Sequence, residues 1–89
     1  MRENRLSPRT PASGSVEISF EDPVPTRVVG DLLDVSVQGF RATYDCDRLE
    51  PGSMVNFSRE GALGRARLVW THVLGGRKVG GFHVLDAPA

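Results

Sequence analysis

The sequence is poor in cysteine and lysine, and it has no long apolar run. Its 89 residues include one cysteine, Cys46, and one lysine, Lys78. A single cysteine excludes a disulfide within the chain and fits a reducing compartment, so we expect a cytoplasmic protein. No apolar stretch approaches the ~18 residues of a membrane-spanning helix, and the polar N-terminus is unlike a signal peptide. We therefore expect no contact with a membrane.

Net charge is also lacking, because eleven basic and eleven acidic residues balance. Domains that bind nucleic acid through a basic face are usually strongly basic, so that function is not expected. Few aromatic residues are present for stacking on bases. All basic residues except Lys78 are arginines. This bias suits planar, bidentate recognition of a ligand, although GC-rich coding explains it equally well.

Signs of catalysis are absent as well. His72 and His83 have no cysteine or carboxylate near them at zinc-ligand spacing, and no nucleophile motif occurs. Cys46 lies between Asp45 and Asp47, whose charges disfavour the thiolate. We therefore expect that the protein is not an enzyme and that it holds no metal and no cofactor.

Short alternating segments make up most of the chain. Six runs in which apolar and polar residues alternate, separated by glycine, proline or polar residues, predict β-strands, and no helical pattern occurs. The predicted strands cover residues 15–20, 27–37, 40–44, 54–57, 65–71 and 78–85. We predict an all-β domain over 15–89, a small antiparallel barrel or sandwich.

Alternation also predicts which side chains enter the core. The second predicted strand places four apolar residues on one face: Val29, Leu33, Val35 and Val37. That face would include Asp31, so we expect a bulge near Gly30 that turns this residue outward. In the fifth predicted strand, Trp70 is expected in the core beside Ala66 and Leu68 rather than on a surface where it would stack on a ligand.

Residues 1–14 are predicted to form a flexible, extended arm. Pro8 and Pro11 prevent a helix and leave the arm without ladder hydrogen bonds. In extended chain Arg5 and Arg9 lie on one side, up to ~13 Å apart, and reach two groups of one ligand of dinucleotide size. The alternative is a disordered basic tail.

The segment 34–39 reads Asp-Val-Ser-Val-Gln-Gly at the end of the second predicted strand. Asp34 and Ser36 point to one face, where the carboxylate accepts hydrogen bonds from ring N–H and amino groups. Gly39 is expected where the backbone needs a positive φ or has a close neighbour. A ligand with guanine and phosphate groups would use these residues together with the arm arginines. The alternative is a polar outer face that leads into a turn.

The RxxxR pattern of Arg5 and Arg9, followed by DxSxxG over 34–39, resembles the PilZ domain family, which binds the bacterial second messenger cyclic di-GMP. Residues 66–70 and 79–82 are similar to the last two strands of that family. The resemblance implies a six-stranded barrel with the arm against its outer surface. It also implies ligand contacts, with Arg5 and Arg9 on guanine and phosphate, Asp34 and Ser36 on guanine, and Gly39 leaving room for the ligand.

The resemblance thus implies a cyclic di-GMP receptor or adaptor whose arm orders over the ligand and signals to a downstream protein partner. The rival hypothesis is a PilZ-like interaction module that does not bind nucleotide. Such a module is expected to lack the motif arginines, which this sequence retains at Arg5 and Arg9.

Overall fold

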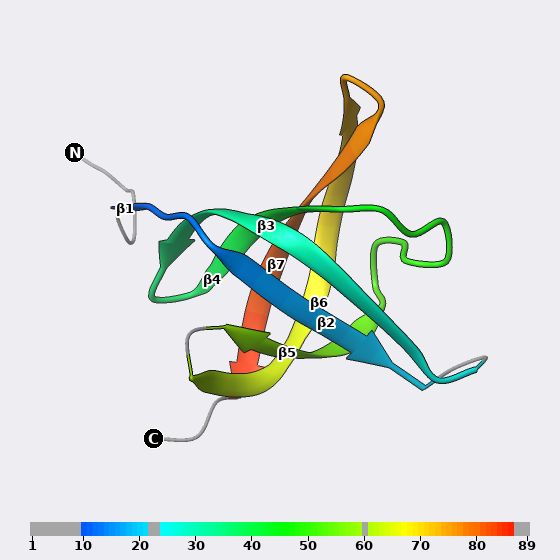
Figure 1. Ribbon diagram of the computed structural model, residues 1–89. Coiled ribbons are helices and arrows are strands. Elements are labelled where there is room, and N and C mark those ends of the chain that lie inside the picture. The colour runs from blue at the N-terminus through cyan, green and yellow to red at the C-terminus, as the bar shows by residue number, and fades with distance from the viewer. Residues whose placement is uncertain (1–9, 22–23, 60, 87–89) are drawn as a thin grey trace.

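In the computed structural model (Figure 1), residues 10–21, 24–59 and 61–86 are described, and their regular structure is entirely β-strand. The strands are β1 (Thr10–Pro11), β2 (Ser15–Phe20), β3 (Thr26–Ser36), β4 (Gly39–Tyr44), β5 (Met54–Arg59), β6 (Ala62–Leu74) and β7 (Arg77–Asp86). The six predicted strands are confirmed, and β1 is additional. The described residues contain no helix that could cross a membrane.

The strands form one closed antiparallel barrel. Their order is β1-β3-β2-β5-β6-β7-β4, and a further pairing between β3 and β4 closes the ring. Figure 1 shows the six longer strands wrapped around a common interior, with the β6–β7 hairpin extending beyond it. That hairpin turns at Gly75 and Gly76, whose φ angles of 57° and 82° are those of a two-residue turn with both central residues left-handed. The predicted six-stranded barrel is therefore confirmed.

The core is built around an aromatic cluster. Phe40 of β4 stacks on Phe82 of β7 with ring centroids 5.0 Å apart, and Phe57 of β5 tilts against Phe40 at 5.2 Å. Tyr44 is fully buried, and its hydroxyl shares a hydrogen bond of 2.8 Å with the Thr71 hydroxyl. The phenol therefore satisfies its polar group while its ring packs in the core.

The predicted inward face of β3 is wrong over the first part of the strand. Val28 and Leu32 are buried, whereas Val29 and Leu33 are 62% and 37% exposed. Asp31 is exposed without any bulge at Gly30. The alternation in the sequence predicts the opposite phase. Valine and leucine occupy both faces of this strand, so hydrophobicity alone does not choose between them.

A bulge does occur in β3, three residues later than predicted. The register between β3 and β4 shifts between Leu32 and Asp34, so Leu33 is the extra residue. One extra residue reverses the faces of everything that follows. Val35 consequently packs against the core, as predicted, and Asp34 and Ser36 share the outer face.

A second bulge overturns the prediction that Trp70 belongs to the core. Leu68 pairs with Phe82, but Trp70 pairs with Gly81, so Val69 is an extra residue in β6. Trp70 therefore turns to the outer face, where it is partly buried over Gly81. It lies outside the cluster of buried core side chains.

The predicted arm is partly attached to the barrel. Thr10 and Pro11 pair with Val35 and Asp34 of β3, and the Ala12 N–H donates to the Leu33 carbonyl at 3.0 Å. The expectation that prolines leave this part without ladder bonds is wrong, because a proline is tolerated where its missing N–H would face away from the ladder. Residues 1–9, which include Arg5 and Arg9, lie outside the described residues.

The revised position of Trp70 gives a test of the core. Phe40 is 0% exposed and contacts two other core rings, so Phe40→Ala should cost about 3–5 kcal/mol of unfolding free energy. Trp70→Ala removes contacts on the outer face only and should cost about 1–2 kcal/mol. Urea denaturation of both variants measures the difference. A Trp70→Ala cost equal to that of Phe40→Ala would contradict the outward orientation.

Candidate functional site

The DxSxxG segment forms a tight hairpin between β3 and β4. Ser36 pairs with Gly39, so Val37 and Gln38 form a two-residue turn. The Gln38 N–H donates to the Ser36 hydroxyl oxygen at 3.3 Å, a local bond that helps shape such turns. Val37 is 87% exposed, which overturns the expectation that it faces the core.

Asp34 is a charged residue of this hairpin, and it is nearly inaccessible to solvent. Its residue exposure is 5%, although it lies on the outer face. Its Oδ2 accepts a hydrogen bond of 2.6 Å from Arg41 Nε, and Arg41 Nη2 contacts the same oxygen. The two side chains differ in access, since Arg41 is 41% exposed and Asp34 is 6% exposed. The pair therefore shows its guanidinium to solvent and buries its carboxylate.

The ion pair with Asp34 stabilises the charged form of Arg41. The hydrogen bond to Asp34 has the largest influence on the pKa of Arg41 and raises it. Burial lowers that pKa, and the attraction of the Asp34 charge raises it again. Arg41 was missed by sequence reasoning, although a two-residue turn at 37–38 puts residues 34 and 41 opposite each other and could have identified it.

Two rows of paired residues cross the outer face from β3 to β6. The first row runs through Asp34, Arg41, Gly81 and Trp70. The second row runs through Ser36, Gly39, His83 and Arg67. Directly paired residues of neighbouring strands have Cβ atoms about 4.5–5.5 Å apart. Each row therefore contains one glycine. The β3 end of each row carries a polar side chain, and the β6 end carries an aromatic ring or a cation.

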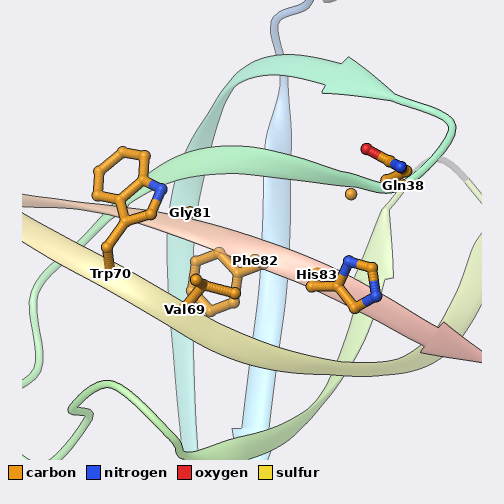
Figure 2. Close-up of a pocket in the computed structure, with 7 residues that line it drawn as sticks. Gln38, Val69, Trp70, Gly81, Phe82 and His83 are labelled. Atoms are coloured by element: carbon orange, nitrogen blue, oxygen red, sulfur yellow. The ribbon is translucent and has the colours of Figure 1, made fainter. Parts of the chain in front are cut away.

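A hollow of about 150 Å³ lies on this face. It is lined by Gln38, Gly39, Val69, Trp70, Gly81, Phe82 and His83. Figure 2 shows the Trp70 ring at one end and Gln38 and His83 at the other, with Gly81 and Phe82 between them. Of these residues, sequence reasoning had placed only Gly39 in the site. Gln38 is the neighbour of Gly39 within the motif, and the others come from β6 and β7, which only the barrel brings to the motif.

Strand β1, which follows the N-terminal motif in the sequence, pairs with the same hairpin. Thr10, the residue directly after Arg9 in the sequence, pairs with Val35, which lies between Asp34 and Ser36. Arg5 and Arg9 themselves lie outside the described residues. The described chain thus begins, directly after the RxxxR motif, beside DxSxxG, although the two motifs are separated by about twenty-five residues in the sequence.

Gly39 has a structural reason to be glycine. It pairs with His83, and a Cβ at this position would overlap the carbonyl oxygen of Phe82 in β7. A close neighbour, rather than a positive φ, is therefore what the position requires, since Gly39 is not among the glycines with positive φ. The missing side chain allows β4 to lie close to β7.

No group of His, Cys, Asp and Glu side chains that could hold a metal ion occurs in the described ranges. The chain matches no protein-family model and no curated protein. The resemblance to the PilZ family therefore rests on the two motifs and on the strand pattern.

The close approach at Gly39 makes a prediction that is independent of any ligand. Gly39→Ala should lower the unfolding free energy by about 2–3 kcal/mol or more, because β4 must move away from the β7 backbone. Gly30 serves as a matched variant outside the motif, since a Cβ there would overlap the Thr43 carbonyl oxygen in the same way. Thermal denaturation without ligand should show both losses. Unchanged stability in Gly39→Ala would mean that this glycine is not required by packing.

Proposed function

We propose that this protein is a PilZ-type receptor for cyclic di-GMP. The observation that carries the proposal is the pairing of Thr10, the residue directly after Arg9 in the sequence, with Val35 between Asp34 and Ser36. The described chain that follows the arginine motif therefore lies beside acceptors for a guanine edge. A guanine nucleotide with phosphate groups needs both kinds of group.

The outer face offers a flat ligand several kinds of contact. Arg41 is the accessible member of its pair with Asp34, and a guanidinium fork suits phosphate oxygens or a guanine edge. Trp70 stands over Gly81 at the far end of the same row, where an indole ring suits stacking on a base. Gly39 and Gly81 line the hollow beside Trp70, where a planar group approaches the sheet.

Asp34 has two roles in the proposal. In the free protein it holds Arg41 in place through the 2.6 Å hydrogen bond. In the complex its carboxylate accepts hydrogen bonds from guanine, beside or in place of those that it accepts in the free protein. At 5% exposure this second role requires that neighbouring groups move when the ligand binds.

Arg5 and Arg9 supply the phosphate contacts in the proposal, and residues 1–9 close over the ligand. The surface formed by the closed arm then recruits a downstream protein partner. Residues 10–12 serve as the fixed base of this movement, because they are already paired with β3.

Calorimetric titration with cyclic di-GMP tests the proposal directly. We expect binding in the micromolar range, about −8 kcal/mol, and weaker binding of cyclic di-AMP, GMP and GTP. Asp34→Asn should weaken binding by about 1–3 kcal/mol, as expected for loss of one good base contact. Asp31→Asn is the matched control, because Asp31 is an exposed carboxylate of the same strand that pairs with Arg77.

Two results would count against this reading. A folded protein that gives no heat with cyclic di-GMP would favour the rival interaction module. Equal losses in the Asp34→Asn and Asp31→Asn variants would show that the effect of Asp34 is general electrostatics and not recognition of guanine.

Closure of the arm is tested by hydrogen exchange. Amide exchange in residues 2–9 should slow when cyclic di-GMP is added, because ordering the segment over the ligand protects its N–H groups. The Ala12 amide, bonded to Leu33, is the internal reference and should be protected with and without ligand. Unchanged exchange in 2–9 at saturating ligand would contradict the closing arm, even if binding itself were measured.

A further inference from the structure

Strand β6 has an unpaired edge along the part that leaves the barrel. Its pairing with β5 ends at Arg67, and the Leu68 N–H and carbonyl bond to Ser53 and Gly52. From Val69 to Leu74, β6 pairs with β7 and with no other strand of the described chain. Figure 1 shows this end of the β6–β7 hairpin extending away from the barrel. Such an edge presents backbone N–H and C=O groups that suit pairing with another strand.

The edge lacks the features that usually protect an exposed strand. Natural edge strands are blocked by charged residues or proline, but residues 68–76 contain neither and form the longest stretch of the chain without a charged residue. Three apolar side chains of this stretch are more than half exposed: Val69, Val73 and Leu74. With no net charge, the chain also has no overall repulsion between copies.

The sequence of this edge is nearly symmetric about Thr71. Residues 68–74 read Leu-Val-Trp-Thr-His-Val-Leu. In an antiparallel pair of two identical strands centred on Thr71, Val69 would face Val73 and Trp70 would face His72 of the second copy. Residues 69–73 contain no charged residue, so no like charges would oppose each other across this stretch. An isologous interface needs this self-complementarity, whereas pairing with an unrelated strand does not.

We propose that two copies of this chain associate by antiparallel pairing of their β6 edges about Thr71. The backbone of Thr71 lies at the two-fold axis, while its hydroxyl remains bonded to Tyr44 inside each barrel. Aromatic and β-branched residues in direct cross-strand positions stabilise such a pair. The contact uses up the free edge of both copies, so it closes as a dimer instead of growing into a filament. It goes beyond the proposed ligand function and does not depend on it.

Light scattering after gel filtration tests the dimer on the full chain without ligand. The small contact predicts weak association, so protein should be loaded over about 10 µM to 1 mM. The mass should rise from 9.7 kDa toward twice that value. Val73→Glu should weaken association at least about tenfold, because it places a charge opposite Val69 of the second copy. Within its own hairpin the new carboxylate faces Lys78, which favours folding.

Val29→Lys is the matched control. Val29 is 62% exposed on β3, away from the β6 edge, and the new lysine faces Glu17 across its own ladder. This variant should associate like the wild type. A wild-type mass of 9.7 kDa throughout, dimerisation of Val73→Glu, or loss of the dimer in Val29→Lys would each overturn the proposal.

Disulfide trapping tests the register of the two paired β6 strands without introducing a charge. In a Cys46→Ser background, Val69→Cys and Val73→Cys chains should form a mixed disulfide on oxidation, since directly opposed residues lie close enough for one. A mixture of Val29→Cys and Val73→Cys chains should not. Equal cross-linking in the two mixtures would refute pairing about Thr71.

Discussion

Closure of the sheet between β3 and β4 is the constraint on which the rest of the structure depends. β3 bonds to β2 along one edge and to β4 along the other, and β4 in turn bonds to β7. The closing strand also carries Phe40, whose ring stacks on that of its partner residue Phe82. A chain of this size buries only about 60–65% of its unfolded surface. Because the core is small, the fold also depends on backbone pairing around the whole ring, which leaves few peptide groups without a hydrogen bond.

Two bulges decide what the outer surface displays. The extra residues Leu33 and Val69 lie on the strands at either side of the β4–β7 pair. Each reverses the faces of its strand, and together they turn Asp34 and Trp70 to the same side of the sheet as Arg41 and Gly81. Without the bulge at Val69, Trp70 would enter the core as alternation predicts. Trp70, which lines the hollow, reaches the outer face because of the bulge at Val69.

The same surface carries features that a purely structural sheet would avoid. Glycine in the interior of a strand loses more conformational entropy on folding than other residues, yet Gly39 and Gly81 lie within paired strands. Asp34 is a buried carboxylate, which needs its Arg41 partner to be tolerated. Gly39 and Gly81 line the hollow beside this ion pair. The β6 edge lies on the opposite side of the hollow from the ion pair. Local costs to stability thus gather on one face of the barrel.

The sequence by itself determined the number and order of the six long strands, their approximate bounds and the all-β class, because apolar and polar residues alternate over short segments. It also marked Gly39 as a position that needs either a positive φ or a close neighbour, and the structure shows the close neighbour. It did not determine the phase of β3 or the orientation of Trp70, since a single inserted residue reverses a strand face and leaves no mark in the composition. Attachment of residues 10–12, the partnership of Asp34 with Arg41, and the hollow that joins Gln38 to Trp70 were decided by tertiary structure. These features depend on which strands become neighbours and in which register, and the closed ring of backbone hydrogen bonds sets both.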